Sequence, residues 1–81
     1  MLASVFASAA TASAQYGGCV DAYGTSVPTI VEPHLGDAAR AKLSAPTEID
    51  VDPVGISRLS YLGGEFTYWH ECGHLALRTQ N

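Results

Sequence analysis

The sequence is poor in charge, and in positive charge most of all. Only 15% of its 81 residues are charged, against about 25% in an ordinary soluble domain. The four basic residues are scattered, and the formal net charge is -4; they are Arg40, Lys42, Arg58 and Arg78. Nucleic acids and anionic membrane surfaces are bound by clustered positive charge. The composition therefore argues against both as partners.

The sequence also lacks an apolar run long enough for a stable membrane span, which needs about 20 residues. Its most apolar stretch lies in residues 1–14, which carry no charge and end in Ala-Ser-Ala before Gln15. This ending is typical of a signal-peptidase site, although no basic residue follows Met1. We expect a signal-peptide-like leader over 1–14 and export to the periplasm or the extracellular space. The alternative is an Ala/Ser-rich N-terminus without this role.

Cysteine is rare as well, with only Cys19 and Cys72. A domain as small as residues 15–81 usually needs a disulfide, a metal or a partner for stability. In an oxidising compartment the two cysteines could pair with each other. Pairing with cysteines elsewhere and two free thiols are the alternatives, because the sequence does not give the distance between them.

Four segments before residue 65 have recognisable patterns. Residues 27–31 are β-prone but contain one proline and are followed by another, which predicts a short edge strand at best. Asp37 is a plausible N-cap for a short helix over 38–43, ended by Pro46. Residues 47–52 alternate acidic and apolar side chains, which predicts a strand with one apolar face. The acidic residues lack the glycine and distal glutamate of a calcium-binding EF-hand, which favours a solvated strand face.

The last predicted element is a helix from about residue 65 to residue 77, with no proline inside it. Ser57 or Ser60 could cap it, and the glycines at 63–64 predict a bend or a late start. Because this segment is apolar nearly all round, we expect it to be buried on most sides. Gly73 is costly in mid-helix, so we expect another backbone to pass close to it.

The helix carries a pair of histidines with metal-binding spacing. His70 and His74 are four residues apart, which on an α-helix means a turn of about 400° and a rise of about 6 Å. Both imidazoles therefore lie on one face and could reach one metal ion. Glu71 lies beside this face, and Phe66 and Leu77 lie above and below the pair. Cys72 points away from it, which suits a structural thiol or a disulfide.

Residues 70–74, HECGH, match the HExxH signature of the zincin metallopeptidases. Residues 66–77 resemble the active-site helix of small exported bacterial zinc peptidases with this core. The resemblance implies that His70 and His74 hold Zn²⁺ and that Glu71 is the catalytic base. Peptide bonds of a peptide or protein substrate would be hydrolysed by a metal-activated water. By the same analogy, strand 48–51 would be the edge strand that binds the extended substrate.

The implied fold is α+β. Residues 15–81 would form a partial metallopeptidase-like domain, comparable to a zincin N-terminal subdomain, with one or two short strands and one long C-terminal active-site helix. Leu77 and Gln80 stand where the elongated metzincin pattern has Gly and His. No acidic residue follows His74 to serve as the third ligand of a gluzincin. We therefore expect a fragment, the N-terminal part of a longer peptidase.

A third metal ligand from upstream is the alternative to a fragment. His34 is the first candidate, followed by Asp50 or Asp52. A different class of function is also open, namely a non-catalytic exported protein that binds metal or has only a structural role. Zinc binding without hydrolysis, persisting when Glu71 is changed, would favour the metal-binding module. A failure to bind zinc would favour the structural protein.

Overall fold

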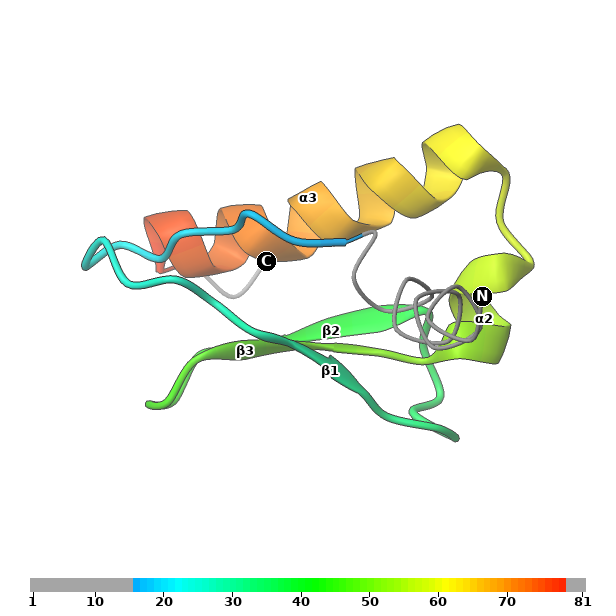
Figure 1. The fold of residues 1–81 in the computed structure, drawn as a ribbon, viewed down its shortest axis with the longest axis horizontal. Coiled ribbons are helices and arrows are strands. Elements are labelled where there is room, and N and C mark those ends of the chain that lie inside the picture. Colours follow the sequence, from blue (N-terminus) through cyan, green and yellow to red (C-terminus); the bar gives the residue numbers. More distant parts are fainter. Residues whose placement is uncertain (1–15, 79–81) are drawn as a thin grey trace, which may run out of the picture.

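A computed structural model of the chain describes residues 16–78, so the predicted leader over 1–14 lies outside the described residues. The elements are, in chain order, β1 (Thr29–Val31), β2 (Ala39–Lys42), β3 (Glu48–Val51), α2 (Pro53–Ser57) and α3 (Tyr61–Leu77). The long helix α3 lies along one face of the small sheet, with α2 at one end (Figure 1). The predicted α+β class is confirmed.

The sheet has the strand order β1-β3-β2. Strand β1 is parallel to β3 and pairs Thr29 with Ile49, whereas β2 is antiparallel to β3 and pairs Arg40 with Asp50. The predicted edge strand in residues 27–31 is confirmed as β1. The expectation that 48–51 is a substrate-binding edge strand is wrong, because β3 is paired on both sides. Among residues 16–78, β1 and β2 are the outer strands, and their outward edges pair with no further strand.

Strand β2 replaces the helix predicted over residues 38–43. Alanine favours helices, but only by a few tenths of a kcal/mol per residue over most other residue types, and tertiary pairing overrides so weak a preference. Here the alternation of small and basic residues serves a strand, since Ala39 is buried and Arg40 is exposed. Asp37 does not cap a helix; its carboxylate accepts a hydrogen bond from the Arg40 guanidinium at 2.9 Å.

Strand β3 has the predicted two faces. Ile49 and Val51 are buried in the core, while Glu48 and Asp50 on the other face are partly exposed. Helix α2, which follows at once, was not predicted. Its N-terminus is capped by Asp52, whose carboxylate accepts hydrogen bonds from the backbone N–H groups of the second and third helical residues. The proline at the first helical position suits a helix start.

Helix α3 begins at Tyr61, about four residues earlier than predicted, and the two glycines at 63–64 lie inside its first turn. Ser60 is its N-cap, as one of the two predicted candidates, and accepts a hydrogen bond from the Gly63 N–H at 3.0 Å. The helix ends at Leu77, and its C-cap Arg78 adopts a left-handed conformation with φ 55°. A left-handed residue of this kind is a common helix terminator.

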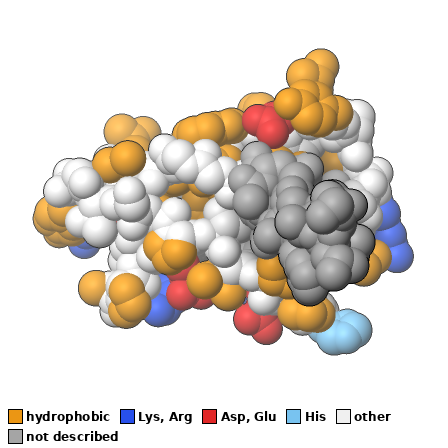
Figure 2. Space-filling view, viewed as in Figure 1, with side chains coloured by type: hydrophobic (Ala, Val, Ile, Leu, Met, Phe, Trp, Pro, Cys, Tyr) orange, Lys and Arg blue, Asp and Glu red, His pale blue; other side chains and the backbone are white. Residues whose placement is uncertain are grey.

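One face of α3 packs on the core, and the other faces are half-buried or exposed. The buried residues are spaced by four, four and three positions; they are Gly64, Tyr68, Cys72 and Leu75. Large apolar side chains on the other faces are exposed, among them Leu62 at 76% and Phe66 at 70%. Figure 2 shows such side chains along the top of the molecule, over α3. The expected burial on most sides is therefore wrong for this chain.

The glycines of α3 also differ from expectation. Among residues 16–78, nothing outside the helix lies within 4 Å of a Cβ built on Gly73, so the expected close backbone is not found there. The tight position is Gly64, where a Cβ would lie 2.5 Å from the Tyr16 hydroxyl oxygen. Tyr16 is buried and stacks on Tyr68 with 5.6 Å between ring centroids.

A disulfide joins Cys19 to Cys72, which selects one of the three predicted alternatives. The segment that carries Cys19 runs beside α3 (Figure 1) and is also held by a hydrogen bond from the Ala22 N–H to the Leu75 carbonyl. Both cysteines lie in the core cluster with Ile49. Neither helix of the described part of the chain is long and apolar enough to cross a membrane.

Candidate metal site

Helix α3 brings the three predicted site residues together. Metal-ligating atoms of His70, Glu71 and His74 all lie within 4.8 Å of one another. The two imidazoles are nearly perpendicular, with ring centroids 4.7 Å apart. His70 is exposed and the other two side chains are partly buried. The i, i+4 spacing on a regular helix accounts for the histidine pair, and the site is open to solvent.

Phe66 lies one turn before His70 and stacks on its ring, with centroids 5.8 Å apart and an interplanar angle of 27°. The sequence placed Phe66 and Leu77 above and below the histidines, where they could shield the site from solvent. Both side chains are at least 70% exposed, so they form an apolar rim and do not enclose the site. A rim of this kind leaves an entry path for a metal ion and for a larger ligand.

Glu71 connects the site to the sheet. The backbone N–H of Ala41 in β2 donates a hydrogen bond to Glu71 Oε1 at 2.9 Å, across 30 residues of sequence. Because β2 is an outer strand, this N–H points away from β3. The candidate site therefore lies beside the free edge of β2. The small-and-basic alternation of residues 39–42 is compatible with a strand, but it does not predict that this strand lies beside Glu71.

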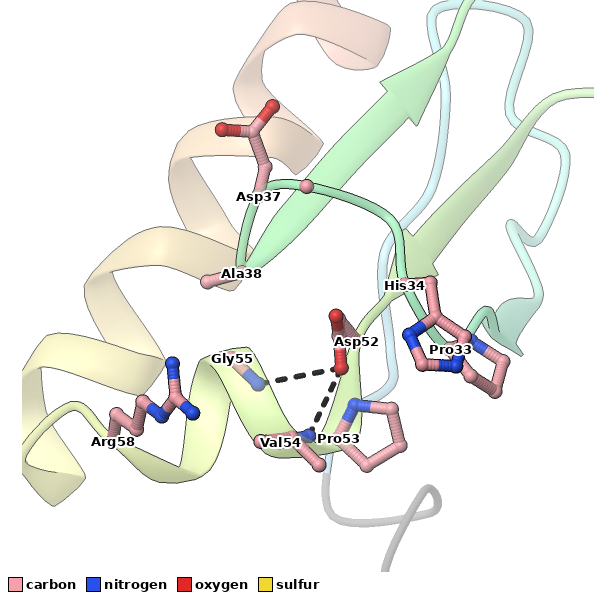
Figure 3. A pocket seen from close by; sticks show the side chains of 10 residues that line it. Pro33, His34, Asp37, Ala38, Asp52, Pro53, Val54, Gly55 and Arg58 are labelled. Carbon is pink, nitrogen blue, oxygen red and sulfur yellow. Dashed lines mark hydrogen bonds between the residues drawn. The ribbon is translucent and has the colours of Figure 1, made fainter.

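The upstream ligand candidates do not join the site. Within residues 16–78, His70, Glu71 and His74 are the one group of three metal-ligating side chains, and it excludes His34 and Asp52. These two residues line a separate pocket of about 730 Å³ beside α2 (Figure 3). The Asp52 carboxylate is engaged in capping α2, and the backbone hydrogen bond from the Gly55 N–H is the main cause that lowers its pKa.

Asp50, the remaining candidate, is directed elsewhere. It lies on the face of β3 opposite to the buried Ile49, and its carboxyl group is close to that of Glu48. A hydrogen bond with the Asp50 carboxyl, together with desolvation and charge repulsion, raises the pKa of Glu48. These carboxylates do not form a three-ligand group within the described residues. The carboxylates share one face of β3 as predicted, but this face is not fully solvated, because Asp50 Oδ1 is buried without a hydrogen-bond partner among residues 16–78.

No known protein family, curated protein or solved structure matches the chain. The chemistry of the site therefore follows from its own residues. Two imidazoles and a carboxylate are ligands that zinc and other divalent transition metals accept. One carboxylate oxygen of Glu71 is bound by a backbone N–H, which leaves the other oxygen available to a metal or to a water molecule. The donor set fits a divalent metal ion.

Proposed function

We propose that this chain carries the zinc-binding half of a zincin-type metallopeptidase site and that it hydrolyses peptide bonds. The observation that carries the proposal is the convergence of His70, Glu71 and His74 on one side of α3, beside the free edge of β2. Histidine pairs at this spacing with an adjacent glutamate are the working parts of HExxH hydrolases.

Each side chain has a separate role in this proposal. His70 and His74 hold the zinc ion. When bound, the ion supplies Lewis-acid polarisation of the scissile carbonyl and a lowered pKa for an attacking water. Glu71 takes the proton from that water and passes it to the leaving amine. Within residues 16–78, no other side chain joins His70, Glu71 and His74 to serve as a further ligand.

Strand β2 takes the part that the resemblance first assigned to residues 48–51. An extended peptide can add to the free edge of a sheet through backbone hydrogen bonds. Of the two free edges, the one at β2 is in contact with Glu71. A substrate paired with β2 would therefore pass next to the candidate base.

We also propose that the protein is exported. The buried disulfide between Cys19 and Cys72 supports this, because such bonds persist in oxidising compartments and are rare in the cytosol. The leader predicted over residues 1–14 points the same way.

A non-catalytic metal-binding module is the second candidate. It is favoured by one observation, namely that the described residues supply two histidines and no further ligand apart from Glu71 itself. If Glu71 coordinates the ion, it is not available as a base. The two functions therefore differ in what happens when the carboxylate of Glu71 is changed to an amide.

The test is a zinc titration of the full chain with a competing chromophoric chelator, combined with a hydrolysis assay on a quenched fluorescent protein substrate. The variants are His70→Ala, His74→Ala and Glu71→Gln, with His34→Ala as the matched control outside the site. We expect one zinc per chain, lost in both site histidine variants and retained in His34→Ala. Glu71→Gln should keep the zinc and lose hydrolysis by about 100-fold or more.

Other outcomes decide against the peptidase. Loss of zinc in Glu71→Gln would make Glu71 a ligand and favour the non-catalytic module. Zinc binding by the wild-type chain without any hydrolysis would also favour that module. The absence of stoichiometric zinc binding would remove both functions and leave a small structural protein.

A further inference from the structure

The N–H of Ala41 has two uses that exclude each other. Just before β2, the carbonyl of Ala38 accepts a hydrogen bond from the Asp52 N–H, which follows β3. Backbone groups alternate in direction along a strand, so Ala39 and Ala41 point to the free edge. The observed hydrogen bond from Ala41 to Glu71 confirms this direction. An added strand would need the same outward N–H as a donor.

A single N–H donates one good hydrogen bond at a time. In the described structure the Ala41 N–H is directed at Glu71 Oε1 with a distance of 2.9 Å. A peptide carbonyl that pairs with β2 at this residue must displace the carboxylate. Glu71 is partly buried and stands on the regular helix α3, so its side chain can rotate away without a change in the backbone.

We propose that an extended peptide acts as a gate on the candidate base. When the peptide pairs with β2, its carbonyl accepts the hydrogen bond from the Ala41 N–H, and Glu71 is released. This inference rests on the proposed function, because it assigns the peptide to β2 and the base role to Glu71. Without peptide, one carboxylate oxygen is occupied by the edge of the sheet. When peptide pairs with β2, that oxygen is released at the moment when the scissile bond is next to it. Binding and activation of the base are then one event.

Removal of a side chain from a binding site usually weakens binding, but here the opposite is expected. Glu71 competes with the peptide, so its removal should strengthen peptide binding. Hydrogen bonds to a charged acceptor are among the stronger ones in proteins, and we expect a gain in affinity of about tenfold. Glu71→Gln keeps an uncharged acceptor, so the gain in that variant should be smaller.

The experiment measures fluorescence anisotropy of a labelled, neutral hexapeptide of alternating threonine and valine with blocked ends. The full chain is treated with a chelator so that bound peptide is not cleaved. Wild type is compared with Glu71→Ala and Glu71→Gln. Glu65→Ala is the matched control, because it removes the same charge from the same helix. We expect tighter binding in Glu71→Ala, a smaller gain in Glu71→Gln, and no change in Glu65→Ala.

A second set of variants tests whether the effect passes through Ala41. Ala41→Pro deletes the donor on an edge strand, where proline is tolerated. In that background Glu71→Ala should no longer raise the affinity. Ala39→Pro removes the other outward N–H of β2 and is the matched control, since the effect of Glu71→Ala should persist there. Circular dichroism and the intact disulfide show that each variant is folded.

The gate is overturned if Glu71→Ala binds the peptide as wild type does or more weakly. It is equally overturned if the gain survives in the Ala41→Pro background, or if the peptide binds no variant. The proposed function is tested separately by the zinc titration and the hydrolysis assay, whose results do not depend on these affinities. Zinc-dependent hydrolysis without the affinity gain would leave the peptidase standing and remove only the gate.

Discussion

Cys19 and Cys72 are joined by a disulfide across 53 residues of sequence, and this bond ties the segment before β1 to the middle of α3. Cys72 is the immediate neighbour of Glu71 and lies on the buried face of the helix. The cross-link therefore holds the helix against the core at the level of the candidate site. Small domains with a limited apolar core commonly depend on such a bond.

The first prediction concerns this disulfide. Replacing both cysteines by alanine should lower the free energy of unfolding by about 2 to 4 kcal/mol, because a loop of this length is freed in the unfolded chain. Urea unfolding of the double variant beside the oxidised wild type measures the loss, and the reduced wild type is the control. A loss below about 1 kcal/mol would show that the segment around Cys19 does not depend on the cross-link.

Two glycines of α3 should respond in opposite ways to alanine. Gly73→Ala should raise the free energy of unfolding by up to about 1 kcal/mol, since its Cβ meets open space and alanine favours the helix. Gly64→Ala places a Cβ 2.5 Å from the hydroxyl oxygen of the buried Tyr16, and overpacking costs about 1 to 3 kcal/mol. Thermal unfolding of the pair gives the comparison. Equal shifts of both midpoints would contradict the close contact at Gly64.

The hydroxyl of Tyr68 is fully buried and has no hydrogen-bond partner among residues 16–78. Tyr68→Phe should therefore leave the free energy of unfolding within about 1 kcal/mol of wild type, with a change toward greater stability, because an unpaired polar group is removed. Tyr68→Ala is the comparison and should cost about 3 to 5 kcal/mol through the lost ring. A large loss in Tyr68→Phe would reveal a partner for the hydroxyl.

Acid should weaken the fold through two carboxylates that accept backbone hydrogen bonds. The Gly55 N–H is the main cause that holds the pKa of Asp52 below its ordinary value of 3.8, and the Thr25 N–H does the same for Asp21. A folded-state pKa below the unfolded value gives stability that is fully present above 3.8 and is lost as the pH falls through the folded value.

Urea midpoints between about pH 5 and about pH 2.5 measure this loss. Asp52→Asn keeps a good helix cap but no longer titrates, so its midpoint should fall less steeply with acid than that of wild type. Asp21→Asn tests the other carboxylate in the same way. Identical acid limbs in wild type and both variants would show that neither group contributes.

Local signals in the sequence identified elements with a clear alternation of side chains and elements with a local cap. The apolar and acidic alternation of residues 47–52 predicted β3 correctly, and Ser60 was one of the expected caps of α3. The alanines of β2 misled the prediction, because their strand conformation depends on pairing with β3, which lies further along the chain. Helix α2 was missed although Asp52 and Pro53 are typical of a helix start.

In the candidate site, too, local geometry was predictable from the sequence and tertiary contacts were not. Spacing on one helix predicted the convergence of His70, Glu71 and His74, since it needs only helix geometry. The contact between Glu71 and Ala41 depends on how β2 lies beside α3, which no local pattern gives. For the same reason the sequence could not choose between the Cys19–Cys72 bond and its alternatives.

The two free edges of the sheet also bear on how copies of the chain behave toward one another. Unpaired strand edges are where proteins aggregate, and short length, proline and positive charge protect them. Strand β1 has three residues between Pro28 and Pro33, and the four residues of β2 include Arg40 and Lys42. Each edge is thus too short or too charged to recruit strand after strand. The edge of β2 could therefore bind a single peptide without promoting the assembly of fibrils.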